Sequence, residues 1–442
     1  MMHDSTVNKK LILLELNEVN FDVVKCYLEK SPGKYPWLEK LTKCANIRTS
    51  AEEKYEELEP WIQWVSVHTG LSFDDHRVYR LGDIVGSKVP QFFEVLESQG
   101  LIVGGISAMN AENRLKHPAY FIPDPWTKTP TDGCFWSEAL AQAVGQAVND
   151  NAQSKITVKS AVALLLGLLR FAKVRHYGLY MKLALNSRKA SWRKALLLDL
   201  LLHDVHLALM ASRKTDFSTV FLNAGAHIQH HYFFNAVPVK QTTHLRNPIW
   251  YLPETEDPFA DMLEVYDTII GEYLALKDAE IMVVTGLAQK PYDRIKYYWR
   301  LKDHAGFLKA VGIKYRTVMP RMTRDFLIEF DSPDQAVEAQ EKLIQMVVTS
   351  DGEPLFGEID NRGASLFVTL TYPHEIADDA SVLLDGAAVR IKQYTTFVAI
   401  KNGMHQTEGF AFFSPGAARF LPAEHSHVKE IHSAVVGYFG VK

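Results

Sequence analysis

Short apolar runs that alternate with helical patterns are the feature that most constrains how this chain can fold. Residues 11–14, 218–222 and 279–285 are runs of strand length rich in Leu, Ile, Val and Phe. Stretches with amphipathic helical spacing stand between such runs, at residues 21–41, 60–69, 90–99 and 259–276. This alternation predicts an α/β fold in which a mainly parallel sheet is flanked by helices.

Three of the 17 histidines stand beside these predicted strands. His227 and His230 follow the strand at 218–222, and His405 precedes another apolar run at 410–413. Ligands of α/β proteins bind outside the carboxyl ends of the strands, and residues three apart on a helix point to similar sides. Because imidazole is a common metal ligand, the placement predicts a site built around His227, His230 and His405.

The distribution of charge is more informative than its total. The chain has 442 residues, 47% of them hydrophobic, enough for one large domain with insertions or for two to three domains. Between Lys155 and Lys214 twelve basic residues are opposed only by Asp199 and Asp204, a local charge of +10 in a chain of net charge −4. Such asymmetry indicates that this segment faces an anionic partner.

Two segments interrupt the alternation of strands and helices. Residues 151–214 are expected to form a basic helical insertion with two long helices joined near 186–189. Neither apolar run in it reaches about 18 residues, so neither is expected to span a bilayer. A lid or membrane-surface hairpin and a helical subdomain with a solvated basic face remain alternatives. Residues 321–399 are expected to form a small α+β insertion, which leaves 1–150, 215–320 and 400–442 for the α/β core.

Several classes of protein are disfavoured. The three cysteines, Cys26, Cys44 and Cys134, have no paired spacing, which indicates a reducing compartment rather than a disulfide scaffold. The first apolar run is too short for a signal peptide, so we expect a cytoplasmic protein, with membrane association through 155–214 as an addition. No glycine-rich nucleotide motif occurs, and the basic segment lacks interleaved aromatics, so nucleic acid is not an expected partner.

The order of these pieces resembles that of a known family. A strand ends in Asn17-Glu18, a Trp-rich helix ends at Thr69-Gly70, and Asn223 leads to His227 and His230. A strand end at 284–286 and a Gly-x-His-x-x-x-Gly pattern over 403–409 complete the series. This order is similar to a divergent member of the alkaline phosphatase superfamily, of its type I phosphodiesterase/nucleotide pyrophosphatase-like branch. The resemblance implies an alkaline-phosphatase-like core with two divalent metals, usually zinc, beside a Thr or Ser nucleophile.

This chain departs from the family at most of the positions that carry its chemistry. Asn17 stands where the family has its first Asp ligand, and Glu59-Pro60 stands near the place of the nucleophile. The Asp of the family's Asp-x-x-x-His is replaced by Ala226, and its Asp-His-Gly by residues 286–289. By this resemblance one metal site is lost, and the other keeps His230 and His405. With His227 as a third ligand, a single metal with a bound water, as in catalytic zinc sites, is the expected remnant.

Four further residues are candidates for the chemistry. Glu18 and Glu59 are placed to act as general base or as replacement metal ligands, and Asn17 and Gln63 are polar candidates in the same region. Each also has a structural alternative. Glu18 and Asn17 would suit the start of the following helix, and Gln63 lies on a helix whose tryptophans suit a core.

Two hypotheses about function follow. The first is a phosphoric or sulfuric ester hydrolase or transferase with a single-metal mechanism, acting on an anionic small-molecule, lipid-linked or glycan-linked substrate. The second is a catalytically inactive protein of this fold that serves as a binding or assembly partner. A third reading, in which Asn17, Glu18, Gln63 and His230 act without metal, also stays open.

Overall fold

The computed structural model describes residues 9–149, 157–187, 190–321, 324–384 and 386–441. The chain divides into two compact units, one of Met1–Pro291 with Gly403–Lys442 and one of Tyr292–Asn402. The second unit contains the segment 321–399 that the sequence set apart, and it begins earlier along the chain. The basic segment belongs to the first unit.

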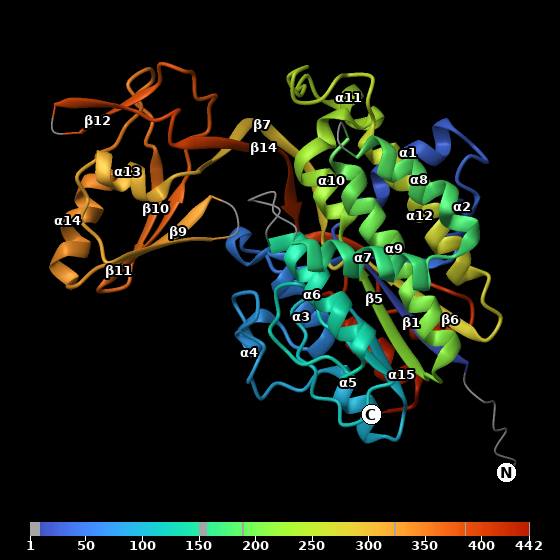
Figure 1. The fold of residues 1–442 in the computed structure, drawn as a ribbon. Coiled ribbons are helices and arrows are strands. Elements are labelled where there is room, and N and C mark those ends of the chain that lie inside the picture. The colour runs from blue at the N-terminus through green and yellow to red at the C-terminus, as the bar shows by residue number, and fades with distance from the viewer. Residues whose placement is uncertain (1–8, 150–156, 188–189, 322–323, 385, 442) are drawn as a thin grey trace, which may run out of the picture. The chain divides into compact units, whose positions relative to one another are not determined.

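A seven-stranded sheet in the order β2-β15-β6-β1-β5-β3-β4 forms the centre of the larger unit (Figure 1). Its strands are β1 (Lys10–Leu16), β2 (Ala45–Ser50), β3 (Val103–Ile106), β4 (Tyr120–Ile122), β5 (Phe217–Leu222), β6 (Ala279–Val284) and β15 (Glu408–Phe413). β1 pairs in parallel with β5 and β6, and β3 pairs in parallel with β4 and β5. Only β15, against β2 and β6, pairs antiparallel in this sheet. The predicted α/β class with a mainly parallel sheet is confirmed.

Helices cover both faces of this sheet. They are α1 (Phe21–Lys30), α2 (Pro36–Thr42), α3 (Pro60–Thr69), α4 (Phe73–His76), α5 (Phe92–Ser98), α6 (Phe135–Asn149), α7 (Val158–Phe171), α8 (Tyr177–Asn186), α9 (Trp192–Ser212), α10 (Ala224–Tyr232), α11 (Val237–Thr242), α12 (Pro258–Leu274) and α15 (Glu430–Tyr438). Short 3-10 turns occupy Tyr55–Glu57 (η1), Val174–His176 (η3), Phe233–Asn235 (η4) and Ala418–Phe420 (η5). The single helix expected over residues 21–41 is two helices, because Gly33 adopts a positive φ and Pro36 starts a new helix.

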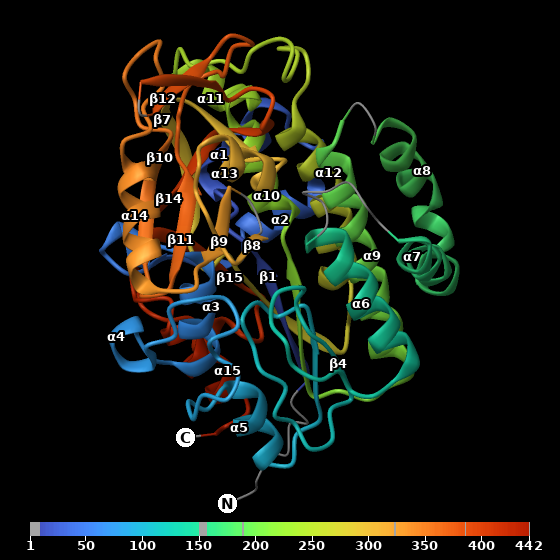
Figure 2. The same ribbon diagram turned by 60° about the vertical axis from the view of Figure 1, so that its left-hand side comes forward.

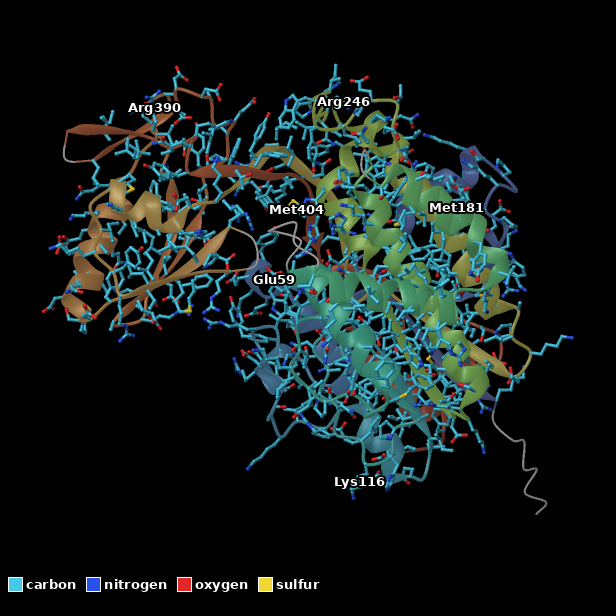
Figure 3. The ribbon with its side chains drawn as sticks, in the orientation of Figure 1. Glu59, Lys116, Met181, Arg246, Arg390 and Met404 are labelled. Carbon is cyan, nitrogen blue, oxygen red and sulfur yellow. The ribbon has the colours of Figure 1, made fainter. Side chains whose placement is uncertain are left out.

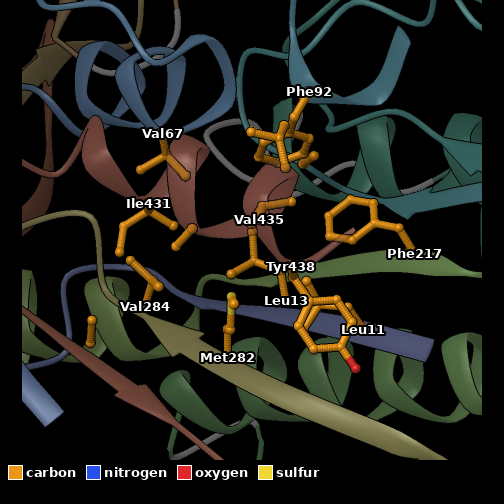
Figure 4. Packing of buried hydrophobic residues seen from close by; sticks show 14 of the residues in the cluster. Leu11, Leu13, Val67, Phe92, Phe217, Met282, Val284, Ile431, Val435 and Tyr438 are labelled. Carbon is orange, nitrogen blue, oxygen red and sulfur yellow. The ribbon is translucent and has the colours of Figure 1, made fainter. Parts of the chain in front are cut away.

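Alternate residues of the central strand supply the two cores. Leu11 and Leu13 pack with Met282 and Val284 of β6 under Val67 of α3, Phe92 of α5, and Ile431, Val435 and Tyr438 of α15 (Figure 4). On the other face, Phe21 of α1 lies against Phe412 of β15 at 4.4 Å between ring centroids. Full burial of each such side chain contributes about 1.5–3 kcal/mol. A strand buried on both sides is continuously apolar, which is why β1 was visible in the sequence.

The basic segment contains three helices and a 3-10 turn where two helices were expected. α7 packs on α6, and α8 packs on α9, so that α7 and α8 lie outside α6 and α9 in Figure 2. Of the junction expected near 186–189, residues 188–189 lie outside the described part of the chain, as do residues 151–156. Among the described residues, α9 alone is long and apolar enough to cross a membrane, but 67% of its apolar window is buried in the protein. α9 packs against β5, α10 and α12 and is therefore a core helix.

The smaller unit has a separate α+β core. Four antiparallel strands in the order β10-β11-β9-β8 are accompanied by two helices and a β12-β13 hairpin. The elements are β7 (Ala288–Leu301), α13 (His304–Ala310), β8 (Thr317–Pro320), β9 (Asp325–Glu329), α14 (Pro333–Ile344), β10 (Phe356–Asn361), β11 (Ser365–Leu370), β12 (Ser381–Leu384), β13 (Ala387–Arg390) and β14 (Thr395–Gln406). β7 and β14 pair with each other as a ribbon, and each continues into the larger unit.

Candidate functional site

The residues that follow β1 lie at the carboxyl edge of the sheet, between the ends of its two neighbours. The Asn17 N–H donates to the Leu222 carbonyl at the end of β5, at 3.0 Å. The Glu18 N–H donates to the Thr285 carbonyl just past β6, also at 3.0 Å. The backbone of the central strand is thus fixed on both sides at the edge where α/β proteins bind ligands.

Glu18 has an unusual backbone conformation. Its φ is 59°, in the left-handed region that non-glycine residues rarely occupy. Its carbonyl accepts a hydrogen bond from Gln229 Nε2 at 2.8 Å, so α10 helps to hold this conformation. Such a backbone costs of the order of 1–3 kcal/mol and persists where the surrounding structure enforces it, commonly at functional sites.

The Glu18 side chain meets two imidazoles. Glu18 Oε2 lies 3.1 Å from His230 Nε2 of α10 and 3.1 Å from His405 Nε2 of β14. The two rings are 5.2 Å apart, edge to face. The Glu18 side chain is 2% exposed, whereas His405 is 12% and His230 31% exposed, so the group opens toward solvent on the His230 side.

The carboxylate is held in its charged form. Burial raises the pKa of Glu18, but the charges and hydrogen bonds of His230 and His405 lower it more, and the pKa lies well below its usual value. Two amides fix its orientation: Gln289 Nε2 donates to Oε2 at 2.5 Å, and Asn17 Nδ2 donates to Oε1 at 3.1 Å. Glu18 is therefore a buried anion that is paired only with histidines and amides among the described residues.

The side-chain amide of Asn17 is held by three hydrogen bonds, one of them to Glu18. Its side-chain oxygen accepts a hydrogen bond from Trp64 Nε1 at 2.7 Å, and its amide also donates to Asn223 Oδ1 at 2.8 Å. Trp64 is fully buried on α3 and joins the core under the sheet. The amide group of Asn17 thus connects α3 and the end of β5 to the Glu18 carboxylate.

Of the two candidates near the start of α3, the structure brings one to the site. Glu59 precedes α3, and its Oε2 lies 3.8 Å from His405 Nδ1; Figure 3 labels Glu59 and Met404, the neighbour of His405. Gln63 is buried instead, and its Nε2 donates to the Glu57 carbonyl at 2.9 Å. Gln63 therefore fastens η1 to α3, and no described contact joins it to Glu18.

His227 is not part of this group, contrary to the sequence prediction. Its ring lies edge to face with His231, at 4.9 Å between centroids. Burial, aided by the nearby charge of His230, lowers the pKa of His227 to about 4. Three residues of helix turn by about 300°, so His227 and His230 diverge by about 60° rather than pointing the same way. Glu18 takes the place that the third histidine was expected to fill.

Two glutamines at the site were not recognised as such in the sequence. Gln289 binds Glu18 as described, and Gln229 bridges the Glu18 carbonyl and the Asn20 N–H, which lies 3.1 Å from Gln229 Oε1. A Cβ at position 403 would lie 2.0 Å from Gln289 Oε1, so glycine is required two residues before His405. The glycine of the Gly-x-His pattern was the available signal for this close packing.

The donor set fits a divalent metal. The ligand atoms of Glu18, His230 and His405 all lie within 4.8 Å of one another. Two imidazole nitrogens and one glutamate oxygen form one of the sets that hold catalytic zinc, with a fourth position left for water or substrate. The Gln289 and Asn17 amides resemble the outer hydrogen bonds that orient metal-binding carboxylates. These three residues would therefore hold the ion.

A second group of histidines and carboxylates lies away from the sheet edge, between η3, α9 and α12. It consists of His176, His203, Asp204 and Glu272. His176 Nδ1 lies 2.9 Å from Asp204 Oδ1, and its Nε2 lies 2.9 Å from Glu272 Oε1. His203 Nε2 lies 3.1 Å from Glu272 Oε2. In the sequence, Asp204 stands out only as a counter-charge in the basic segment, and no pattern predicts this group.

Protein cations and hydroxyls already surround the second group. Lys173 and Arg175 pair with Glu272, and Tyr180 Oη donates to Asp204 at 2.9 Å. Burial lowers the pKa of His176, but hydrogen bonds and charges of Asp204 and Glu272 raise it more, to about 9. Burial raises the pKa of Glu272, but hydrogen bonds with His176, His203 and Lys173 lower it more, to well below its usual value. This is a buried ion-pair network with a protonated histidine at its centre.

Some solved structures are similar to this chain at low sequence identity. No family model and no curated protein matches the sequence. Among solved structures, phosphonoacetate hydrolase from Sinorhizobium meliloti aligns over 98% of this chain and 96% of its own, at 12% identity and a TM-score of 0.41. Murine ectonucleotide pyrophosphatase/phosphodiesterase 5 aligns over the same shares at 8% identity and a TM-score of 0.38. Alkaline phosphatase from the Antarctic bacterium TAB5 aligns over 98% of each chain at 10% identity and 0.40.

Proposed function

We propose that the protein is a metal-dependent hydrolase or transferase of phosphoric or sulfuric esters, with a single metal held by Glu18, His230 and His405. The observation that carries the proposal is the convergence of one carboxylate oxygen and two imidazole nitrogens at the carboxyl edge of the sheet. A divalent ion in such a set, zinc in our proposal, supplies Lewis-acid chemistry and lowers the pKa of water to about 7.

The side chains around this group have distinct parts in the proposed reaction. Glu18 stays anionic because two imidazoles lower its pKa, and Gln289 and Asn17 keep its oxygens in place. Pro60 begins α3 and has no nucleophilic atom, so the attacking group comes from solvent. Glu59, partly exposed and beside His405, is placed to accept a proton from that water.

The substrate we propose is an anionic ester, either a small molecule or one linked to a lipid or glycan. In the segment between Lys155 and Lys214, four exposed basic residues form no ion pair with another described residue: Lys159, Arg170, Lys194 and Lys214. These charges support an anionic partner, because a basic surface raises the local concentration of anions. A cytoplasmic location belongs to the same proposal.

The proposal is tested on purified protein loaded with zinc, by elemental mass spectrometry after dialysis and by hydrolysis of aryl phosphate monoesters, diesters and sulfates. We expect about one ion per chain, lost in Glu18→Gln, His230→Ala and His405→Ala, together with activity that falls about 100-fold or more. His227→Ala and the exposed His425→Ala are matched controls that should keep the ion. Absence of bound metal, or its persistence in all three site variants, would overturn the proposal.

A second candidate is an inactive binding or assembly protein of the same fold. It is favoured by the contacts of Asn17, whose amide is fully engaged by Trp64, Glu18 and Asn223, and by the proline at position 60. Metal bound at Glu18 without turnover of any of the three ester classes would favour this candidate.

A further inference from the structure

The helices α7 and α8, with the turn η3 between them, present an unusual concentration of apolar side chains to solvent. We name this surface the apolar helix face. It consists of Val162, Leu165, Leu166, Leu169, Val174, Tyr177, Met181 and Leu185. Leu169, Val174 and Leu185 are 69%, 78% and 75% exposed, and Met181 is labelled in Figure 3. Contiguous exposed apolar surface of this kind marks a binding surface.

Helical spacing makes each part of this face continuous. Val162, Leu165, Leu166 and Leu169 occupy positions i, i+3, i+4 and i+7 of α7, which lie on one side of a helix. Tyr177, Met181 and Leu185 are spaced by four residues on α8. Within the described part of the chain, no element covers these side chains.

The opposite sides of the same helices are fixed to the protein. Gly167 of α7 packs against Leu140 of α6, where a Cβ would lie 3.0 Å from Leu140 Cδ2. Phe171 is buried and lies edge to face with Trp136, and on α8 Tyr180 and Leu183 are buried. The apolar helix face is therefore a second, outward face of helices that are already docked, rather than a core surface that lacks its partner element.

The charges beside this face select the kind of partner. From residue 155 to residue 198 the sequence contains ten basic residues and no Asp or Glu. Four of them pair with acidic residues of α12: Lys173 and Arg175 with Glu272, Lys182 with Glu264, and Arg193 with Asp261. Lys159 and Arg170 on α7 are exposed, and neither forms an ion pair with another described residue. Lys182 on α8 is paired with Glu264 and stays half exposed. A partner that complements this face therefore has an anionic surface with an apolar layer beneath it.

We propose that the apolar helix face docks on the surface of an anionic phospholipid bilayer, with α7 and α8 lying in the interface. Helices with an apolar face flanked by Lys and Arg bind in this way, with leucines in the acyl boundary and cations at the head groups. Tyr177 is of the residue type that favours this boundary. α9 remains in the protein core, so the contact is peripheral and not a membrane span.

This inference goes beyond the proposed function, because the face shares no residue with the Glu18 site. If both hold, bilayer docking would bring the site to esters carried by lipids. The two can fail separately, since vesicle binding requires no turnover and hydrolysis of a soluble ester requires no vesicle.

Sedimentation with vesicles of phosphatidylcholine alone, or of equal parts phosphatidylcholine and phosphatidylglycerol, tests the proposal in the full-length protein. We expect binding to the mixed vesicles, weakened by high salt, and little binding to phosphatidylcholine alone. The double variant Leu165→Gln/Leu169→Gln should lower the partition coefficient about tenfold or more, and Lys159→Glu should lower it less. Ile249→Gln/Trp250→Gln is the matched control, because these residues are 77% and 57% exposed elsewhere in the larger unit.

Three results would overturn the proposal. The first is absence of binding to the mixed vesicles, and the second is equal loss in the test and control variants. The third is a stable dimer in gel filtration that dissociates in Leu165→Gln/Leu169→Gln, which would make a second copy of the chain the occupant. Circular dichroism of the variants, with unchanged helix content, keeps loss of folding apart from loss of docking.

Discussion

Two groups of histidines and carboxylates lie in the larger unit, and their surroundings differ. Around Glu18, the neutral amides of Gln289 and Asn17 and two partly exposed imidazoles approach the carboxylate. Around Glu272, the cations Lys173 and Arg175 approach in addition to two buried imidazoles. Both groups satisfy a simple count of potential metal ligands.

The difference shows that the partners of a carboxylate say more about its role than the presence of nearby histidines. A metal at Glu272 would have to displace Lys173 and Arg175, which already neutralise the carboxylate. No Lys or Arg of the described chain pairs with Glu18. A cation bound there would therefore supply the positive charge that neutralises this buried carboxylate. We therefore assign a structural role to the Glu272 group and a ligand-binding role to the Glu18 group.

The largest expected effect is loss of stability when the Glu272 network is broken. Glu272→Gln leaves Lys173, Arg175 and a protonated His176 without their common counter-charge, and we expect about 3 kcal/mol lower unfolding free energy. Urea denaturation measures this. Glu264→Gln on the same helix is the control, because Glu264 is half exposed, and should cost less than about 1 kcal/mol. Similar losses in both variants would contradict the structural role.

Zinc should distinguish the two groups directly. With free zinc at about 100 times its dissociation constant, the wild-type protein should gain about 2.7 kcal/mol in unfolding free energy. Glu18→Gln should abolish this gain, because it removes the charged ligand, and His203→Gln should retain it in a less stable protein. Denaturation with and without zinc gives the comparison, and the reverse pattern would move the metal to the second group.

The Glu272 group also predicts a dependence of stability on pH. The pKa of His176 is raised from 6.5 to about 9 in the folded protein, so its contribution is full below pH 6.5 and is lost as pH rises through 9. We expect a loss of about 2 kcal/mol between these values. Urea titrations at both pH values measure it in wild type and in His176→Gln, in which the difference should largely disappear. An unchanged slope in His176→Gln would assign the effect to another group.

The smallest expected effect concerns the backbone of Glu18. At a φ of 59°, glycine is free of the strain that any Cβ introduces. Glu18→Gly should therefore be more stable than Glu18→Ala by about 1 kcal/mol, and by our proposal neither variant should bind metal. Gly and Ala at Glu272, which lies in the ordinary helix α12, should show the opposite order. Equal stabilities of the two Glu18 variants would remove the evidence for stored strain.

Much of the fold could be predicted from the sequence because the strands of its sheet are buried on both sides. The apolar runs at 11–14 and 218–222 lie within β1 and β5, and α3 ends at Thr69-Gly70 as predicted. The break between α1 and α2 and the antiparallel direction of β15 were not predicted. The break between α1 and α2 depends on how the two helices pack across the turn between them. The direction of β15 depends on the route that the chain takes through the smaller unit before it returns to the sheet.

The candidate site could be predicted in part. His230 and His405 were placed by their positions beside strands, and Glu18 was among the candidates. The structure does not bring His227 or Gln63 to Glu18, because the direction of a helical side chain depends on where its helix packs. The group around Glu272 could not be predicted from the sequence. His203 and Glu272 are 69 residues apart in two apolar helices, and only the packing of α9 on α12 brings them together.

The ribbon of β7 and β14 carries two residues of the Glu18 group at one end, Gln289 on β7 and His405 on β14. Side chains alternate between the two faces of a strand, so a slip of one residue in β14 would turn His405 away from Glu18. Between these two positions the chain builds the whole smaller unit. The pairing register of β7 and β14 therefore fixes the direction of His405. The gain or loss of a single residue in either strand would disable the site without changing any residue of the site itself.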